Sequence, residues 1–537
     1  MKKIIELLND ELKAAFSACG YDEKYAKVVV SNRPDLCQYQ CNGCMAAAKE
    51  YKKAPAIIAG EVVEKLAESS TFSKVEAVNP GFINMNLSGQ FIADYVKEMG
   101  SHEKFGCDET KKNKTIMLDY GGANVAKPLH VGHLRPAIIG ESLKRICAYN
   151  GYDTVGDVHL GDWGLQMGLI IMELKNRKPE LPYFDESFTG EYPAEAPFTL
   201  AELEDIYPCA SRKSKEDAEF AEAAHQATVM LQRGHRGYTA IWKHIMNISI
   251  ADLKRNYDNL NVSFDVWKGE SDAKPYIEDM LKSFVDKGYA YESQGALVID
   301  VAQADDKKEI PPCIVRKSDG AALYATTDLA TMIEREKLYH PFKYIYTTDK
   351  RQEMHFTQIF RAAKKTGIVP RDTEMNFLGF GTMNGKDGKP FKTRNGDLLR
   401  LEYLIKDVED AVYNKIKENR DVADDEARAT AKVVGLAAIK YGDLSNQASK
   451  DYIFDIDRFT SFEGDTGPYV LYTIVRIKSI LNKYEQTYGA QSLSVADRMK
   501  DFVAPEGASE TDLCLLLTKF SEVIESAYAE LAPHKIC

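Results

Sequence analysis

The chain has 537 residues, of which 44% are hydrophobic and 28% charged, and its formal net charge is −12. These values are typical of a soluble globular protein with room for roughly three or four domains. No run approaches the ~20 consecutive apolar residues that would span a membrane, and acidic side chains interrupt the first 16 positions, which excludes a secretory signal. The ten scattered cysteines favour reduced thiols and a cytoplasmic location. The acidic balance neither supports nor excludes RNA binding, which depends on local basic surface.

The first 110 residues are expected to form a small α+β domain. An amphipathic helix is predicted over residues 1–16, and the turn Asn79-Pro80-Gly81 separates two strands. The other predicted elements are a strand at 28–30, helices at 38–52 and 57–68, and strands at 75–78 and 82–87. Lysine-rich residues 108–114 mark the boundary with the next domain.

Residues 111–400 alternate between strand-like and helical patterns. The strands are predicted at 115–120, 153–160, 296–301 and 344–348. Strands separated by helices favour parallel βαβ units and a doubly wound, Rossmann-like sheet. The polar stretch 172–260 contains no convincing strand, so we interpret it as a helical insertion between two halves of the sheet domain.

Strand-like patterns stop near residue 400, and helical patterns continue to the end. Helices are predicted at 402–419, 424–441, 466–486 and 511–531. An all-helical bundle over residues 401–537 follows from this pattern. The predicted fold class is therefore multidomain α/β: an N-terminal α+β domain, a doubly wound parallel-sheet domain and a C-terminal α-helical bundle.

The motif His130-Val131-Gly132-His133 lies between the first strand and the first helix of the sheet domain. A strand-like run ends at Tyr120, a turn of small residues covers 121–124, and a helical pattern opens at Leu134. Such a strand, turn and helix start form an anion site, because free backbone N–H groups and the helix dipole point at the ligand. Two imidazoles three residues apart share one face of the first turn, where both can reach a phosphate.

Two basic segments could share that phosphate site. Lys127 adds a mobile cation and, with the two histidines, could stabilise the charge that grows on a phosphorus atom under attack. Far downstream, residues 385–394 combine a glycine-rich turn with four cations: Lys386, Lys389, Lys392 and Arg394. Alone this segment could be a solvated hairpin tip, whereas beside the histidines it is a candidate clamp on a triphosphate.

Acidic and polar side chains suited to a cationic substrate recur where strands end and helices begin. They are Asp119, Asn124, Tyr324 and Asp328. Tyr324 and Asp328 are four residues apart at an expected helix start, so they face the same way. A carboxylate in a cleft could hold a guanidinium in a forked pair, although a surface aspartate at a helix start is an equally ordinary arrangement.

These segments together resemble the arginyl-tRNA synthetases, a subgroup of the class I aminoacyl-tRNA synthetases. The resemblance covers almost the whole chain in the family's order. It is carried by residues 34–36, 80–84, 119–135, 161–164, 267–271, 389–394, 441–445 and 461–476. It implies an N-terminal tRNA-binding domain, a class I catalytic domain and a helical anticodon-binding domain.

The resemblance also implies residue roles. His130, His133, Lys127 and Lys392 would be catalytic, and ATP would contact His130, Gly132, His133, Lys392 and Arg394. Arginine would contact Asp119, Gly122, Asn124, His130, Tyr324, Asp328 and Gln352. No residue is assigned to a tightly held metal, because magnesium would arrive with ATP.

The implied activity is that of an arginine–tRNA ligase, releasing AMP and pyrophosphate, with tRNA(Arg), L-arginine and ATP as partners. In this family, activation usually requires bound tRNA. We expect a cytoplasmic monomer without an editing site, since polar readout of a large cation can reject apolar competitors. Residues 172–260 should accordingly have no hydrolytic activity, and RNA binding should weaken with salt.

The sequence departs from the family pattern in three places. Gly122-Ala123 replace a Ser-Pro pair that is common before the binding asparagine, and Lys392-Thr393-Arg394 is a loose version of the second class signature. The chain also ends at Cys537, where related proteins continue through further helix. We therefore expect either that the chain has been cut short or that its C-terminal domain is abbreviated, and in both cases the apolar face of the last predicted helix would lack a packing partner.

Other interpretations compete with this one. The spacing of Cys37, Cys41 and Cys44 also suits the iron–sulfur cluster of radical S-adenosylmethionine enzymes, although it equally places three small thiols on one helix face. A tRNA-binding paralogue without catalysis would explain the Gly122-Ala123 change, but has no need of the histidine pair. A small-molecule nucleotidyltransferase would use the histidines but needs neither the helical bundle nor the N-terminal domain.

Overall fold

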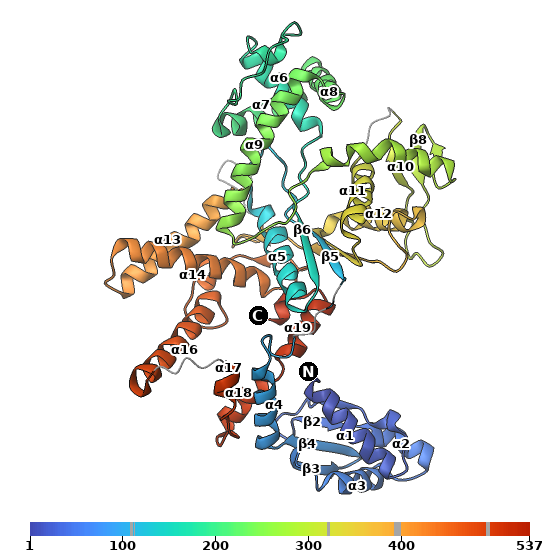
Figure 1. Cartoon of the computed structure of the whole chain (residues 1–537), viewed down its shortest axis with the longest axis vertical. Coiled ribbons are helices and arrows are strands. Elements are labelled where there is room, and N and C mark those ends of the chain that lie inside the picture. The colour runs from blue at the N-terminus through green and yellow to red at the C-terminus, as the bar shows by residue number, and fades with distance from the viewer. Residues whose placement is uncertain (108–110, 112, 319–322, 391–398, 490–494) are drawn as a thin grey trace.

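The computed structural model describes residues 1–107, 111, 113–318, 323–390, 399–489 and 495–537. Most of the predicted boundary segment 108–114 therefore lies outside the described residues. The N-terminal part and the helices between residues 165 and 232 lie at opposite ends of the molecule, with a parallel sheet between them (Figure 1). The predicted site residues that the structure describes lie on or between the elements of this sheet domain.

The N-terminal part is a four-stranded antiparallel sheet packed against helices. Its strand order is β1-β2-β4-β3. The elements are α1 (Ile4–Ala18), β1 (Val28–Val30), β2 (Tyr39–Cys41), α2 (Gly43–Tyr51), α3 (Pro55–Leu66), β3 (Phe72–Val78), β4 (Phe82–Leu87) and α4 (Gly89–Ser101). Leu8 and Leu12 of α1, Ile58 and Val62 of α3, and Ile83 of β4 form its dry core. The α+β prediction is confirmed, although α4 was not predicted.

The helix predicted over residues 38–52 is wrong at its start. Tyr39–Cys41 is strand β2, in which Tyr39 pairs with Met85 and Cys41 with Ile83 of β4. Helix α2 begins only at Gly43. Pairing with a strand more than 40 residues away decides the conformation here, and helical spacing of cysteines cannot reveal such a partner.

Cys37, Cys41 and Cys44 therefore come from a loop, a strand and a helix, not from one helix face. All three are buried free thiols. Burial raises the pKa of the Cys44 thiol to about 12, which disfavours the thiolate that a metal would need. Among the described residues, no group of three or more side chains is placed to hold a metal ion.

The central sheet is four-stranded and fully parallel, in the order β11-β10-β5-β6. Its strands and helices are β5 (Thr115–Asp119), α5 (Leu134–Tyr149), β6 (Asp153–Asp157), α11 (Tyr324–Tyr339), β10 (Lys343–Asp349), α12 (Glu353–Thr366) and β11 (Glu374–Phe380). Ile116, Met117 and Leu118 are all buried, as expected for a sheet covered on both faces. Because the strands are parallel, Asp119, Asp157 and Asp349 end at one edge of the sheet. Three of the four predicted strands lie here, whereas β11 was not predicted.

The fourth predicted strand, at 296–301, forms but belongs to a different sheet. It is β8 (Ala296–Ile299), which lies between β7 (Tyr291–Ser293) and β9 (Cys313–Arg316) in an antiparallel arrangement. The turn Gln294-Gly295 has positive φ at both residues, which suits a two-residue hairpin. Its placement in the parallel sheet was therefore wrong. Helix α10 (Lys274–Asp286) precedes this small sheet.

Residues 172–260 are all described, contain no strand and form the helices expected of the insertion. The helices are α6 (Leu165–Arg177), α7 (Leu200–Glu216), α8 (Ala218–Gln232) and α9 (Arg236–Asn259). They extend away from the parallel sheet (Figure 1). Leu203, Leu231 and Ile241 nevertheless belong to the same hydrophobic core as Ile116 and Leu118 of β5. The insertion is therefore continuous with the sheet that carries the site.

The part after residue 400 is mostly helical, as predicted. Its elements are α13 (Leu401–Asn419), α14 (Asp424–Leu444), α15 (Ile456–Phe459), α16 (Gly467–Tyr488), α17 (Val495–Met499), α18 (Ala508–Leu517) and α19 (Phe520–Ala529). The helix predicted at 511–531 is thus two helices. A short strand also follows residue 400, because β13 (Tyr452–Ile453) pairs in parallel with β12 (Met383–Asn384).

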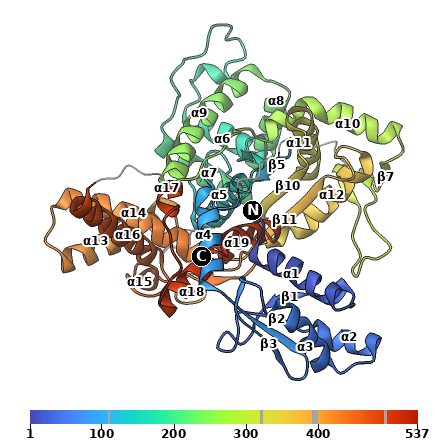
Figure 2. The same cartoon turned by 60° about the horizontal axis from the view of Figure 1, so that its bottom comes forward.

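The last helices return to other parts of the chain. Helices α17 and α18 lie beside α4 of the N-terminal part, and α19 packs on α5 (Figures 1 and 2). Leu513, Leu516 and Leu517 of α18 remain exposed, whereas Ile524 of α19 is buried. Among the described residues, no helix is long and apolar enough to cross a membrane.

Candidate active site

The two histidines of the motif lie against each other at the start of α5. A short 3₁₀ turn, Val131–His133, precedes the helix, and the ring centroids of His130 and His133 are 4.0 Å apart. The His130 N–H donates to Nδ1 of His133 at 3.1 Å, and the Gly132 N–H donates to Nδ1 of His130 at 3.0 Å. Since both Nδ1 atoms accept hydrogen bonds, each neutral ring carries its proton on Nε2.

Both imidazoles are held in the neutral form. Burial lowers the pKa of His133 to about 3, and burial together with the charge of Lys127 lowers the pKa of His130. A neutral imidazole with a proton on Nε2 donates one hydrogen bond to an oxygen atom. The motif therefore offers two N–H donors to a phosphate without adding positive charge of its own.

The expectation of free backbone N–H groups at this helix start is wrong. The N–H groups of Val131, His133 and Leu134 donate to Leu399, His130 and Val131 carbonyls, respectively. Those of His130 and Gly132 are taken by the imidazoles, as described above. An anion at this turn would therefore be bound by side chains rather than by a cradle of backbone amides.

The far end of the predicted basic loop is anchored on the histidine motif. The Val131 N–H donates to the Leu399 carbonyl at 3.0 Å, and the Leu401 N–H donates to the Leu129 carbonyl at 2.9 Å. Phe391, Lys392, Thr393 and Arg394 lie outside the described residues. Residues 399–401, which follow this segment, pair with the chain around His130.

The near end of the same loop is a tight turn whose first lysine faces elsewhere. The Gly385 N–H donates to the Lys389 carbonyl at 2.8 Å. Lys386 forms ion pairs with Asp457 at 2.7 Å and Asp455 at 3.1 Å. One of the four cations assigned to the clamp is therefore already paired with the segment that begins α15.

A cavity of about 340 Å³ lies beside Lys127, just ahead of the histidine motif, and brings several predicted residues together, although neither His130 nor His133 is part of its wall. Asn124, Lys127 and Tyr324 line it, and helix α7 of the insertion adds Tyr207, Ser211 and Ser214. The rest of its wall is Gly161, Gly164, Leu165, Gln166, Leu169 and Glu270. The Lys127 ammonium lies 4.5 Å from the centroid of the Tyr207 ring. The insertion thus helps to form this cavity.

The absence of a side chain at Gly161 leaves room for the Asn124 side chain in the cavity wall. A Cβ atom on Gly161 would lie 2.3 Å from Oδ1 of Asn124. The two residues also form a parallel β-bridge, with the Gly161 N–H donating to the Ala123 carbonyl at 3.0 Å. Gly161 therefore lets the backbone of the Gly161-Asp162-Trp163-Gly164 segment pack closely against Asn124.

Glu270 is a site residue to which the sequence analysis gave no role. It lines the cavity, and burial raises the pKa of its carboxyl to about 7, with Asp162 and Asp328 adding negative charge. Such a carboxyl gains most from a cationic ligand, which would stabilise its ionised form. In the sequence, Glu270 is marked only by its position in residues 267–271, one of the segments that resemble the family. That resemblance did not assign this residue a role.

Asp328 lies one turn after Tyr324 on α11, as its spacing predicted. Its carboxylate is bonded to His355 of α12, with Nε2 of His355 2.6 Å from Oδ2 of Asp328. Tyr324 is 73% exposed and lines the cavity. Gln352 is exposed in the turn before α12 and is not part of the cavity wall.

Asp119 is already paired within the protein. Nη2 of the buried Arg335 lies 2.6 Å from an oxygen of Asp119 and 2.6 Å from an oxygen of Asp157. Nη1 of Arg335 donates to the hydroxyl of Tyr346 at 3.0 Å. Asp119 therefore shares the single guanidinium of Arg335 with Asp157.

His159 lies close to these carboxylates. It follows β6 with a φ of +40°, which is unusual for a residue with a side chain. Both ring nitrogens are buried without a hydrogen-bond partner in the described part of the chain. A positive charge on His159 would lower the pKa values of Asp119 and Glu270, so the ring lies near both carboxyls.

Gly122, which was also predicted to contact arginine, adopts a φ of +58° in an open turn.

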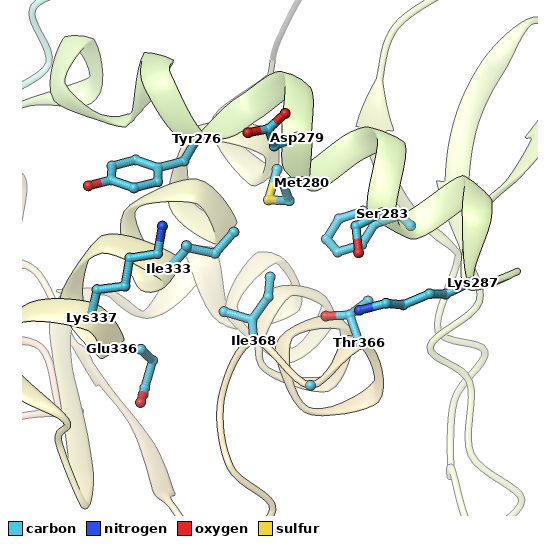
Figure 3. Close-up of a pocket in the computed structure, with 12 residues that line it drawn as sticks. Tyr276, Asp279, Met280, Ser283, Lys287, Ile333, Glu336, Lys337, Thr366 and Ile368 are labelled. Atoms are coloured by element: carbon cyan, nitrogen blue, oxygen red, sulfur yellow. The ribbon is translucent and has the colours of Figure 1, made fainter.

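A second cavity, of about 390 Å³, lies on the other side of α11, between α10 and the end of α12. Figure 3 shows Tyr276 and Lys337 on one side of it and Lys287 beside Thr366 on the other. None of the residues predicted from sequence lines this cavity. We therefore assign the candidate active site to the cavity beside the histidines.

Comparison with known proteins agrees with this geometry. Residues 96–456 match the family described as tRNA synthetases class I (R), catalytic domain, residues 2–87 match the arginyl tRNA synthetase N terminal domain, and residues 470–537 match the DALR anticodon binding domain. An arginine–tRNA ligase of Agathobacter rectalis is 61% identical over 545 residues, covering 100% of this chain and 90% of the relative. One from Alkaliphilus oremlandii is 55% identical with the same coverage.

Solved structures show the same fold. The arginyl-tRNA synthetase of Plasmodium falciparum superposes with a TM-score of 0.78 at 24% identity, covering 100% of this chain and 89% of that one. That of Thermus thermophilus gives 0.73 at 21% identity, with 99% and 89% covered. By its sequence relatives and its matched domains, this chain belongs to the arginyl-tRNA synthetase family.

Proposed function

We propose that the cavity beside the histidine motif carries out both steps of arginine–tRNA ligation. In the first step, the carboxylate of L-arginine attacks the α-phosphorus of ATP, the bond to the β-phosphate breaks, and pyrophosphate leaves. In the second step, a hydroxyl of the terminal ribose of tRNA(Arg) attacks the carbonyl carbon of arginyl-adenylate and AMP leaves. The observation that carries this proposal is one cavity lined by an acidic residue, Glu270, and by Lys127, which lies three residues before the histidine motif.

Arginine recognition would rest chiefly on the carboxyl of Glu270, which forms no ion pair with another described residue. The charge of Asp328 raises the pKa of Glu270, so the two carboxyls lie near each other. A guanidinium presents five N–H donors in a plane and binds carboxylates in forked pairs. Asn124 and Tyr324 would hydrogen-bond to the rest of the substrate, and His130, Gly122, Asp119 and Gln352 complete the set that we assign to arginine.

ATP would be held by the histidine motif with Lys127 on one side and by the basic loop on the other. His130 and His133 would donate their Nε2 protons to phosphate oxygens, and Lys127 would supply a full positive charge as negative charge grows at phosphorus. Gly132 would keep the first imidazole in place. The anchored exit of the loop at Leu399 supports a role for Lys392 and Arg394 on the same phosphates.

Magnesium enters this proposal as part of the nucleotide substrate. Mg²⁺ usually retains several waters and binds through substrate phosphates with few protein ligands, so no resident metal is required. The neutral histidines would then bind a triphosphate whose negative charge is partly neutralised by Mg²⁺. Their hydrogen bonds would orient the α-phosphate for in-line attack.

The organisation around the site is also part of the proposal. We assign residues 1–110 to tRNA binding, 111–400 to catalysis and 401–537 to anticodon binding, in a cytoplasmic monomer. The insertion over 172–260 would have no hydrolytic activity, because Tyr207, Ser211 and Ser214 line the synthetic cavity itself. Sedimentation of the pure protein, and deacylation assays with mischarged tRNA, test these two assignments.

Charging of tRNA with labelled arginine tests the proposed function. Arginine should be esterified to tRNA(Arg), whereas citrulline, which has nearly the same shape but no charge, should be used at least about 10³-fold less efficiently. Equal use of both amino acids would contradict a carboxylate-based site. Binding of tRNA without any ester formation would instead favour the binding-only paralogue.

A further inference from the structure

Arg135 follows the histidine motif by two residues and is buried in the first turn of α5. Its side chain is 2% exposed, and that of its partner Asp443 is 0% exposed. Nε of Arg135 donates to Oδ1 of Asp443 at 2.8 Å, and Nη1 donates to the carbonyls of Gly381 at 2.7 Å and Lys450 at 3.1 Å. One guanidinium thus connects the helix of the histidines to three other segments.

Two of these segments form the root of the basic loop. The Gly381 N–H donates to the Ala448 carbonyl at 2.9 Å, and the Tyr452 N–H donates to the Thr382 carbonyl at 3.1 Å. Strands β12 and β13 continue this pairing up to Asn384, immediately before the loop turn. Arg135 bonds to one carbonyl on each side of the pair, so the loop root cannot shift along α5 without breaking its hydrogen bonds.

The third segment, α14, leads toward the helices matched to anticodon binding. Asp443 lies near the end of α14. The start of α16 packs on the same helix so closely that a Cβ atom on Gly467 would lie 2.2 Å from the Ala437 carbonyl oxygen. The anticodon-binding match begins at residue 470, within α16. Arg135 therefore holds the histidine motif, the loop root and α14 in one fixed arrangement.

Stability alone is a weak explanation for such a pair. Removing two charges from water costs several kcal/mol per ion, and well-packed apolar replacements of a buried pair are often as stable. Nη2 of Arg135 is moreover buried without a partner in the described residues, which adds to the cost. What the guanidinium supplies that an apolar side chain cannot is directional bonding to three segments.

We propose that Arg135, held by Asp443, is a positioning residue for adenylate formation. It fixes the distance between the imidazoles of the motif and the root of the basic loop, so that both reach the same phosphates. This inference rests on the proposed function. It predicts an effect on turnover rather than on substrate affinity, because Arg135 is too deeply buried to touch arginine, ATP or tRNA.

Two variants separate positioning from folding. Arg135→Lys keeps the charge but cannot reach all three acceptors with one compact ammonium. The paired variant Arg135→Met with Asp443→Leu removes both charges and keeps the volume, so it should fold without the directional bonds. Arg361→Lys is the matched control, because Arg361 also binds a carboxylate, Asp306, and a carbonyl, that of Val301, remote from the site.

The readouts are arginine-dependent ATP–pyrophosphate exchange with saturating tRNA, the tRNA Kd and the melting temperature. Both Arg135 variants should lose about tenfold or more in exchange kcat, with the KM for arginine and the tRNA Kd within about twofold of the parent. Arg361→Lys should match the parent in kcat. If Arg135→Lys does not fold, the paired variant decides the question.

Two results would overturn the inference. One is a folded paired variant whose kcat lies within about twofold of the parent, since positioning would then need no guanidinium. The other is a paired variant that fails to fold, because the ion pair would then serve stability. Absence of exchange in the parent protein would instead refute the proposed function, so the two failures are distinguishable.

Discussion

Gly132 lies directly against the imidazole of His130. A Cβ atom at this position would lie 2.8 Å from Cε1 and 2.9 Å from Nδ1 of that ring. The Gly132 N–H also donates to the same Nδ1, at 3.0 Å. The φ of Gly132 is not in the left-handed region, so its backbone conformation does not require glycine. Close packing on the ring of His130 does.

The variant Gly132→Ala should therefore displace the His130 ring and weaken the hydrogen bond that fixes its tautomer. We expect exchange kcat to fall about 10²-fold, because a catalytic group moved by about 1 Å loses that much. The KM for arginine should change little. Gly60→Ala in α3 is the control, since no atom lies within 4 Å of its added Cβ. Equal turnover in both variants would show that the ring position is unimportant.

Glu270→Gln should weaken arginine binding selectively. Loss of one charge-assisted hydrogen bond costs about 1.5–3 kcal/mol, which is about a 10- to 100-fold increase in the KM for arginine. The KM for ATP should remain close to that of the parent, as should both values in Glu278→Gln, an exposed glutamate of α10. An unchanged arginine KM in Glu270→Gln would remove this residue from the recognition site.

Arginine affinity should depend on pH through the same carboxyl. Its pKa in the free protein is raised to about 7, chiefly by burial, so the group is protonated below that pH. A guanidinium favours the ionised form, so binding at pH 6 must release a proton, and affinity should fall about tenfold per pH unit below 7. Protonation of His133 does not contribute to this pH dependence, because its pKa is about 3.

Calorimetry of arginine binding between pH 8 and pH 5.5, in buffers of different ionisation enthalpy, measures that proton directly. Proton release should appear below pH 7 in the parent and disappear in Glu270→Gln. A pH-independent affinity in the parent would mean that Glu270 is already ionised or does not face the ligand.

Replacing Lys127 should lower the exchange kcat far more than replacing Lys386, although both lysines were predicted to belong to the phosphate site. Lys127→Met should lower exchange kcat about 10²-fold, because it removes a charge from the transition state. Lys386→Met should stay within about threefold of the parent, because this lysine is exposed and paired with Asp455 and Asp457. A large loss in Lys386→Met would return that lysine to the triphosphate clamp.

Local patterns predicted the framework of the site well. The strand ending at Asp119, the glycine-rich turn and the helix from Leu134 depend on neighbouring residues, and all three form as expected. The helix start at Tyr324 was equally visible, because its spacing to Asp328 needs only one helical turn. The insertion was recognised by the same means.

Long-range partners were not visible in the sequence. Tyr39–Cys41 becomes a strand because β4 lies beside it, and the carboxylate of Asp119 is paired because Arg335 reaches it from 216 positions away. Glu270 enters the cavity through the path of the chain after the insertion, which no periodicity encodes. The backbone amides of the motif are occupied for the same reason, since Leu399 pairs with Val131.

The central claim is that this cavity activates arginine with ATP in the presence of tRNA. Arginine-dependent ATP–pyrophosphate exchange, measured with and without tRNA(Arg), tests it most directly. We predict exchange only when arginine and tRNA are both present, as the family resemblance implies. Absence of exchange under every condition, with tRNA still bound by the folded protein, would contradict the claim and favour a tRNA-binding protein without catalysis.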